Sequence, residues 1–408
     1  MSGDSDKFSR IVSLRPVLRA PGPAAIASSG AVRLAELVGA VNCCTPHGRH
    51  LIVRQRAPEP APAVFSPGTL RLLLPRARPE DSDPQQWVFL DAETTGLSGG
   101  TGTYAFLVGI AWWEGAELAV EQFFMENHGQ EASMLAGLAE RLSGRRVMVT
   151  FNGKSFDCPL LDTRFRMTRL GAFPAPETHL DLLHPARTLW RLRLKSVALS
   201  ELERHVLDLD RGPDIPSASI PGRYFEFLRG GPPEPLAEIF RHNIKDLQGL
   251  ASLATHMMRL LDRDNEDSSD GAELFGIAKL LRLRGERELA GPGYEKALAR
   301  GLPETAERLA RRELALMSRG RRDFESASSH WKQLKDESRE GMEAYEQLAI
   351  YHEHHAGDLR EALTITQEAL VRLQSAHRSG RITQQQYRRF HAGFNHRLSR
   401  LARKVGIR

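Results

Sequence analysis

Two acidic residues, Asp91 and Glu93, stand one residue apart at the end of a short apolar run at residues 87–90. Successive side chains of a strand alternate between its faces, so these two carboxylates are expected to share one face. Unpaired charges beside a core are costly, and the usual remedies are a cationic partner or a hard metal ion bound through oxygen. Residues 87–114 contain no Lys or Arg. The pair therefore predicts a metal site.

Further ligands for such a site occur later in the chain. Asp157 follows a strand-like run at residues 145–151 and stands where a helix is expected to begin, a position that faces the end of a sheet. His242 and Asp246 are four residues apart, and hence on one face of a predicted helix. We expect four carboxylates to converge within ion-sharing reach, with no arginine neutralising them: Asp91, Glu93, Asp157 and Asp246.

A cluster of this kind is suited to phosphodiester hydrolysis. Two divalent cations roughly 3.5 to 4 Å apart can activate a water and stabilise the leaving oxygen. Oxygen ligands select Mg or Mn rather than zinc, and a histidine beside them is chemically suited to proton transfer. Structural alternatives exist for each residue. Asp91 and Glu93 could stand at a solvated strand end, and Asp157 could cap its helix. Asp246 could be an exposed helix acid, and His242 could be a structural or surface histidine.

The elements that must position these residues follow from the hydrophobic pattern. Three strand-like runs at residues 87–93, 103–113 and 116–126 predict an antiparallel meander. Helices and strands then alternate: a helix at 131–142, a strand at 145–151, a helix at 159–170, a strand at 179–183, a helix opened by a capping box of Ser200 and Glu203, and a long helix at 235–261. This order predicts an α/β mixed sheet of the ribonuclease H type, with parallel strands added to the meander.

Composition divides the chain into four predicted parts. Residues 1–83 are expected to form an irregular Pro- and Ala-rich N-terminal region, with a possible helix at 31–41 and a strand at 50–55. The nuclease-like domain is expected at residues 84–264, an acidic linker at 265–271, and an all-helical region at 272–408.

The helical region carries a repeat at an interval near 35 residues. Equivalent positions are Ala290, Tyr294 and Ala297, then Ala327, Trp331 and Leu334, then Ala362, Thr366 and Ala369. This spacing resembles that of tetratricopeptide helix pairs. The last part, residues 371–408, holds ten Lys or Arg and no Asp or Glu, and predicts a basic amphipathic helix with Thr383 as its cap. That helix could cover the open end of the repeats, contact phosphates, or do both.

Bulk properties restrict the class of protein. Of the 408 residues, 41% are hydrophobic and 26% charged, which is typical of a soluble globular chain. No apolar run approaches the ~20 residues of a membrane span, and the polar start does not read as a signal peptide, so we expect a cytoplasmic protein without membrane contacts. The three cysteines lack zinc-like spacing. The net charge of +5 favours a polyanionic partner only weakly.

Three segments, DAETTGL, FNGKSFDCPLL and HNIKDL, resemble in order and spacing the exonuclease motifs of the DEDD superfamily, the DnaQ-like 3'-5' exonucleases. The chain is most similar to the YprB-like ribonuclease H-like family of bacteria, a resemblance that GGTGTYAFLVG and HLDLLHPARTLWR support. It covers residues 87–259 strongly and the helical region loosely.

The resemblance implies a metal-dependent exonuclease that trims single-stranded DNA or RNA from the 3' end. Asp91, Glu93, Asp157 and Asp246 would hold two Mg or Mn ions, and His242 would orient or deprotonate the attacking water. The spacing of His242 differs from the family pattern, in which the base is a histidine five residues before the last aspartate or a tyrosine four residues before it. Here a histidine stands in the tyrosine position.

The same resemblance suggests substrate-binding residues: Thr94, Gly96, Leu97, Asn152 and Lys154. Leu97 resembles the residue that packs on the terminal base, and could equally be a core residue. Asn152 and Lys154 could bind phosphates or shape a turn. Two other functions remain open: a nucleic-acid-binding or scaffold protein of little or no activity that works through its helical repeats and recruits a protein partner, and a structure-specific endonuclease.

Overall fold

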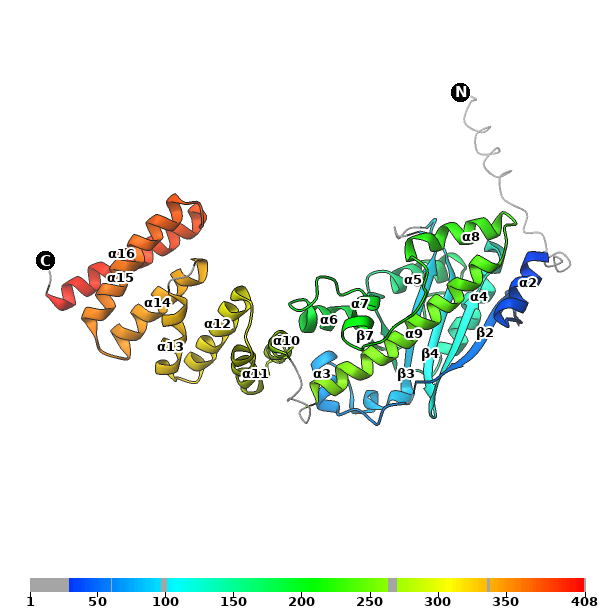
Figure 1. Ribbon diagram of the computed structural model, residues 1–408, viewed down its shortest axis with the longest axis horizontal. Helices are drawn as coiled ribbons and strands as arrows, with labels where there is room; N and C mark the ends of the chain where they lie inside the picture. The colour runs from blue at the N-terminus through cyan, green and yellow to red at the C-terminus, as the bar shows by residue number, and fades with distance from the viewer. Residues whose placement is uncertain (1–28, 60, 97–100, 263–269, 336–337, 407–408) are drawn as a thin grey trace, which may run out of the picture.

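The computed structural model describes residues 29–59, 61–96, 101–262, 270–335 and 338–406. Within them, the chain forms a mixed α/β domain followed by a helical region (Figure 1). The predicted fold class is confirmed.

The described strands form one seven-stranded sheet in the order β1-β2-β5-β4-β3-β6-β7. Its members are β1 (Val41–Thr45), β2 (Gly48–Ala57), β3 (Trp87–Thr94), β4 (Ala105–Glu114), β5 (Glu117–Phe124), β6 (Val147–Thr150) and β7 (Thr178–Asp181). Strands from β1 to β3 in this order pair antiparallel, whereas β6 pairs parallel with both β3 and β7. The expected meander is thus β3-β4-β5, and β3 lies between its antiparallel and parallel parts.

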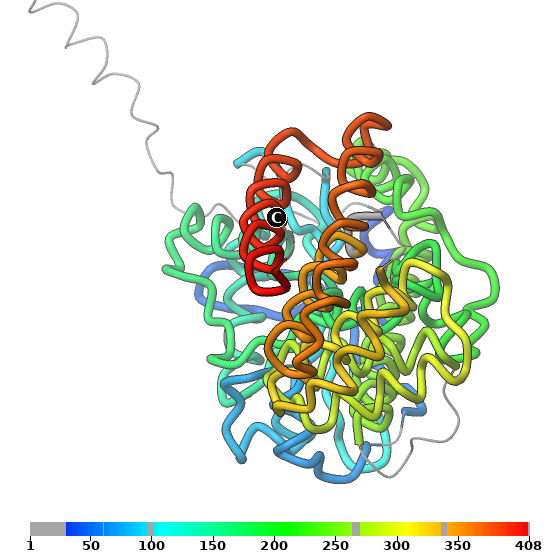
Figure 2. Tube along the Cα trace, turned by 90° about the vertical axis from the view of Figure 1, so that its left-hand side faces the viewer, coloured from blue at the N-terminus to red at the C-terminus, as the bar shows by residue number. Residues whose placement is uncertain are grey.

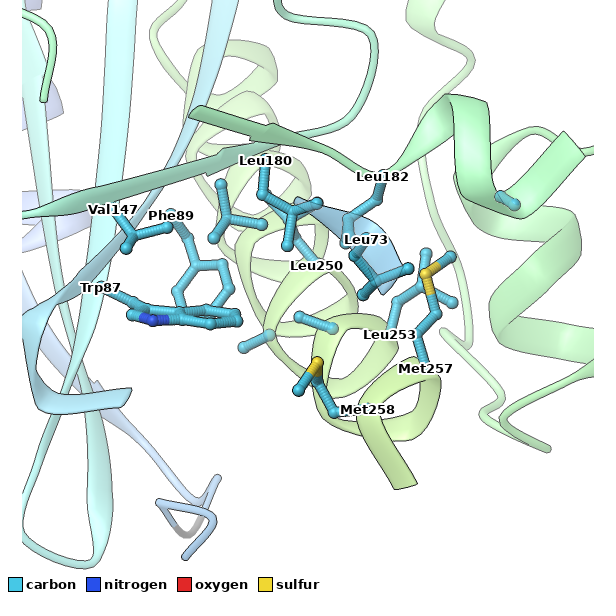
Figure 3. Close-up of a cluster of buried hydrophobic side chains, with 14 of the residues drawn as sticks. Leu73, Trp87, Phe89, Val147, Leu180, Leu182, Leu250, Leu253, Met257 and Met258 are labelled. Atoms are coloured by element: carbon cyan, nitrogen blue, oxygen red, sulfur yellow. The ribbon is translucent and has the colours of Figure 1, made fainter. Parts of the chain in front are cut away.

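Helices cover both faces of the sheet. The long helix α9 (Glu234–Leu261) contacts β3, β4 and β5, and α4 (Glu131–Leu142) contacts β1, β2 and β5. The core on the α9 side joins Trp87 and Phe89 of β3 to Leu250 of that helix (Figure 3). Complete burial of each such side chain contributes about 1.5–3 kcal/mol, so this stripe fixes α9 against β3.

The remaining elements of this domain are shorter. They are α2 (Ser29–Val38), α3 (Pro67–Leu73), α5 (Asp157–Met167), α6 (Leu183–Trp190), α7 (Leu199–His205) and α8 (Ile220–Leu228), with 3₁₀ turns at Pro79–Ser82, Pro84–Gln86, His128–Gln130 and Ser217–Ser219. Helix α8 interrupts a Pro- and Gly-rich stretch where we predicted none. Pro221 is compatible with it because it occupies the first turn, where no intrahelical donor is lost.

The sheet crosses the boundary that we predicted between residues 83 and 84. Strand β2 contains the predicted strand at 50–55 and pairs with β5 from Leu51 to Ala57, and β1 adds an edge strand that we did not predict. Leu51, Ile52 and Val53 are all buried. The N-terminal region is therefore not only irregular: its described part contributes two strands and two α-helices, α2 and α3, to the domain. We did not predict the hairpin of β1 and β2 because the proline-rich segments on both sides of it are typical of a linker.

The capping box predicted for α7 is wrong. The helix begins at Leu199, so Ser200 already lies inside its first turn. The carboxylate of Glu203 does not turn back to cap the helix and instead binds Arg211. The hydrophobic pattern of α7 does not show this contact, because Arg211 lies in the irregular loop that follows the helix.

The helical region consists of helices that each contact the next. They are α10 (Gly271–Leu283), α11 (Arg287–Arg300), α12 (Glu304–Gly320), α13 (Phe324–Leu334), α14 (Ser338–His354), α15 (Leu359–Arg378) and α16 (Gln384–Val405). All nine predicted repeat positions are buried, on α11, α13 and α15. The resemblance to tetratricopeptide repeats stays a prediction. Most of the predicted acidic linker lies outside the described residues.

The helical region is attached to the α/β domain through α10 and α6. The indole of Trp190 donates a buried hydrogen bond of 2.7 Å to Glu273. Gly276 makes the close approach possible, because a Cβ there would lie 2.3 Å from the backbone oxygen of Leu189. At the far end of the molecule, α15 and α16 lie side by side (Figure 2). Thr383 caps α16 in a capping box with Gln386, as we predicted for the cap residue.

Within the described part of the chain, no helix is both long and apolar enough to cross a membrane.

Candidate active site

The structure brings the four predicted carboxylates together from three parts of the fold. Asp91 and Glu93 lie on β3 and share one face of it. Asp157 is the first residue of α5, and the segment between β6 and α5 turns at Asn152, whose φ is +69°. Asp246 lies on α9. Burial raises the pKa of Asp91 well above its usual value, and the charges of Asp246, Glu93 and Asp157 raise it further. The charges of the other three carboxylates therefore all act on Asp91.

The electrostatics of the cluster call for a cation. Burial, followed by the charges of Asp246 and Asp157, raises the pKa of Glu93 to about 8. Burial also raises the pKa of Asp157 to about 7. Carboxylates with such values are stabilised in their ionised form at neutral pH only when positive charge is supplied.

The donor atoms fit a divalent metal ion. One ligand atom each of Glu93, His242 and Asp246 lie within 4.8 Å of one another. The carboxylates of Asp91 and Asp157 are close enough for their charges to act on this cluster. The carboxylate oxygens suit Mg or Mn, and the imidazole of His242 stands beside them, available for proton transfer. This fit makes a metal site the best account of why these carboxylates are gathered.

His242 faces the carboxylates with one ring nitrogen and an additional acid with the other. Its Nε2 is 3.4 Å from Oδ2 of Asp246 and 4.0 Å from Oε1 of Glu93. Its Nδ1 is 2.9 Å from Oδ1 of Asp214. Burial raises the pKa of Asp214, but the hydrogen bond and charge of His242, the backbone N–H of Ile215 and the charge of Lys245 together lower it below its usual value. Because Nδ1 faces the carboxylate of Asp214, Nε2 is the ring nitrogen that faces the cluster.

Asp214 was missed because its loop has no periodic pattern that would place it against α9. By contrast, the four-residue spacing of His242 and Asp246 can be read directly from the sequence. The two residues share one face of α9, as we expected, and both lie in the cluster.

Arg211 contradicts the expectation that no arginine neutralises the cluster. Its Nη2 is 2.5 Å from Oδ1 of Asp246. The absence of Lys and Arg from residues 87–114 did not exclude a cation from elsewhere in the chain, and a loop almost a hundred residues later supplies Arg211. Even so, the pKa values of Asp91, Glu93 and Asp157 remain raised with Arg211 in place. One guanidinium on Asp246 therefore does not satisfy the other three acids.

Asp91 is held by a neutral side chain that sequence reasoning also missed. Asn243 donates a hydrogen bond of 2.8 Å to Oδ2 of Asp91, and its own amide oxygen accepts one of 2.8 Å from Gln122. Gly109 of β4 leaves the space, because a Cβ there would lie 2.0 Å from Oδ1 of Asn243. A glycine in the interior of a strand signals such a close approach.

A cavity of about 530 Å³ opens beside Asp157. Three predicted substrate-binding residues line it, namely Thr94, Gly96 and Asn152, together with Phe156, whose side chain is 55% exposed. Lys154 is exposed but does not line the cavity. Leu97 lies outside the described residues.

The turn at residues 152–154 is fixed by Asp181, the last residue of β7. Its oxygens accept the backbone N–H groups of Asn152 at 2.7 Å and of Lys154 at 3.0 Å. Asp181 is therefore occupied in shaping the loop that leads to Asp157. Asn152 makes the left-handed turn, one of the two roles considered for it, and it also lines the cavity. Phosphate binding by Asn152 stays a prediction.

Comparison with known proteins agrees with this geometry. A family model described as the RNase_H superfamily matches residues 88–258, which include all four carboxylates and His242. A curated protein from Bacillus subtilis (strain 168), "Uncharacterized protein YprB", is 30% identical over 285 residues, which make up 69% of this chain and 68% of that protein. The chain therefore belongs to the family of YprB, with a nuclease-like domain of the RNase_H superfamily.

Proposed function

We propose that this protein is a divalent-metal-dependent 3'-5' exonuclease that acts on single-stranded nucleic acid. The convergence of Asp91, Glu93, Asp157 and Asp246 beside His242 is the observation that carries the proposal. Divalent ions at such a site activate a water and stabilise the leaving oxygen of a phosphodiester.

The residues of the chain would divide the remaining work. His242 takes the proton of the attacking water at Nε2, because Asp214 holds the other ring proton at Nδ1. Asn243 holds the carboxylate of Asp91 in one orientation. His242 stands four residues before Asp246, which departs from the family pattern for a histidine. This spacing suits the role of base, because it places Nε2 of His242 on the side of α9 that faces the cluster.

The cavity beside Asp157 supports action at a chain end. Its volume of about 530 Å³ falls in the range of small-ligand sites, roughly 300–1,000 Å³. The exposed ring of Phe156 offers a surface on which a base can stack, a contact that single strands make readily. Thr94 and Asn152 offer polar groups for the sugar or phosphate.

The direct test uses purified full-length protein and labelled single-stranded DNA and RNA, with Mn and with chelator. We expect Mn-dependent release of mononucleotides from the 3' end, and Asp91→Asn should abolish it while circular dichroism stays unchanged. Full metal-dependent cleavage by Asp91→Asn would refute the assignment of the site. Cleavage of circular single strands would instead identify an endonuclease.

The basic helix α16 favours a nucleic-acid-binding role for the helical region. Its apolar side chains Phe394 and Leu401 are buried, so that face is already used in packing. Arg388, Arg389 and Arg403 are exposed. A surface of this charge suits the phosphate backbone of a strand that extends from the active site. If the protein binds single strands but cleaves none under any metal, a scaffold function replaces the exonuclease.

A further inference from the structure

We propose that Arg211, anchored by Glu203, is a positioning residue of this site that occupies one oxygen of Asp246 and sets His242 through Asp214. The proposal rests on the function proposed above and deepens it. It concerns how Asp246 and His242, the two α9 residues of the site, are held in place.

The guanidinium of Arg211 joins three carboxylates from different elements. Its Nε and Nη2 both donate to Glu203 of α7, with Nη2 2.6 Å from Oε1. The same Nη2 is 2.5 Å from Oδ1 of Asp246 on α9. Its Nη1 donates to Oδ2 of Asp214 at 3.3 Å. The rigid, planar fork of arginine permits these contacts at once, which a lysine could not reproduce.

Helix α9 leaves room for the ion pair of Glu203 and Arg211 because it has a glycine, Gly249, at the point of contact. The side chain of Glu203 is only 2% exposed, and a Cβ at Gly249 would lie 1.5 Å from its Oε1. Gly249 stands three residues after Asp246, on the same side of α9. A buried carboxylate without a cation is strongly unfavourable, so Glu203 requires Arg211 and holds it beside Asp246.

The loop that carries Arg211 is also fixed. Gly212 has a φ of +60°, and its N–H is accepted by the side chain of Asp210 at 2.9 Å. Lys245, the neighbour of Asp246 on α9, donates to the backbone oxygen of Pro213 at 2.7 Å. These contacts place Arg211 independently of its own ion pairs.

Two opposite effects follow from this arrangement. Because the guanidinium covers Oδ1, Asp246 presents only Oδ2 to the cluster, and a positive charge stands next to the cations that the site would bind. Arg211 should therefore weaken metal binding. Its contacts also hold Asp246 and Asp214, and through Asp214 the ring of His242, so it should promote turnover. If Arg211 only stabilised the fold, its presence would strengthen metal binding and promote turnover alike.

The test removes the buried pair as a unit, since Arg211→Gln alone would leave Glu203 unpaired. In Glu203→Gln/Arg211→Gln, we expect Mn²⁺ to bind about tenfold more tightly in isothermal titration calorimetry. The net charge of the pair does not change, but the guanidinium in contact with Asp246 is removed and its Oδ1 becomes available as a ligand. Turnover on the strand that the wild type cleaves should fall by roughly ten- to a hundredfold. The control Arg223→Gln/Glu238→Gln removes an arginine–glutamate pair that also involves α9, and should change neither quantity.

A second variant separates charge from geometry. Arg211→Lys keeps the positive charge but not the fork, so we expect Mn²⁺ affinity near that of the wild type together with reduced turnover. Weaker or unchanged Mn²⁺ binding in the double variant, or undiminished turnover, would overturn the positioning role of Arg211. If the wild type cleaves no nucleic acid, the proposed exonuclease fails, and the calorimetric comparison still decides whether Arg211 occupies the ligand oxygen of Asp246.

Discussion

Replacing Glu93 by glutamine should remove much of the pH-dependent instability of the metal-free protein. Glu93 lies at the buried end of β3 and is 9% exposed. Burial and the neighbouring charges of Asp246, Asp157 and Asp214 raise its pKa from 4.5 to about 8. Glutamine keeps the shape of the side chain and removes the charge.

The sign of the effect follows from proton linkage. Below pH 4.5 the carboxyl group of Glu93 is protonated in both the folded and the unfolded chain, so its contribution to stability is fully present. Between pH 4.5 and 8 the unfolded chain loses this proton while the folded chain keeps it, and the free energy of unfolding falls. A pKa raised from 4.5 to about 8 corresponds to about 5 kcal/mol, lost in full only above pH 8.

Chemical denaturation with EDTA at several pH values between 5 and 9 measures this loss. We expect Glu93→Gln to be more stable than the wild type by up to about 5 kcal/mol near pH 9 and to differ little near pH 5. Mn²⁺ should stabilise the wild type increasingly as the pH rises, because its ligands must lose their protons, and should stabilise the variant less.

Glu140→Gln provides the matched control, since Glu140 is exposed on α4. Its unfolding should keep the pH dependence of the wild type. If Glu93→Gln also keeps that pH dependence in EDTA, burial and the neighbouring carboxylates do not raise the pKa of Glu93 as described. The main argument for a cation at this site would then be lost.

Three further substitutions test other parts of the structure. Gly109→Ala places a Cβ 2.0 Å from the amide that holds Asp91, so it should destabilise the domain by roughly 1–3 kcal/mol and weaken Mn²⁺ binding in calorimetry; unchanged binding would contradict the support of Asp91 by that amide. Gly276→Ala places a Cβ 2.3 Å from a backbone oxygen of α6, so hydrogen exchange should show loss of protection in α6 and α10, and unaltered protection would argue against this close contact. Arg388→Glu with Arg389→Glu should weaken binding of single strands in fluorescence anisotropy and lower the slope of log affinity against log salt by about 1–2, whereas an unchanged slope would remove α16 from the binding surface.

The sequence predicts those parts of the fold in which local pattern and tertiary role coincide. Strand β3 could be recognised because it is apolar up to Leu90, and its two acids alternate with Ala92. Helix α9 could be recognised because its apolar stripe is long and continuous. The strand pair β1-β2 was not assigned to the sheet, because β1 is short and exposed at the edge and gains its partner only through pairing.

The acids of the site were predictable for a similar reason, whereas their supporting partners were not. Asp91 and Glu93 share a face by strand geometry alone, and His242 and Asp246 share one by helix geometry. Asp214 and Arg211 stand in a loop without periodicity, and their positions depend on how the loop crosses α9. The available signals were glycines inside regular elements, Gly109 in β4 and Gly249 in α9, each of which admits a polar side chain next to a ligand.

The two supports differ in charge, and that difference bears on how the site attracts cations. Asp91 is held by the neutral amide of Asn243, which orients the carboxylate and leaves the site as negative as before. Asp246 is held by the guanidinium of Arg211, which orients the carboxylate and also offsets its charge. The negative potential of the cluster is therefore strongest toward β3 and α5 and weaker toward α9. The attraction of the site for a cation thus depends on how many acids converge and also on which of them are paired with a positively charged side chain.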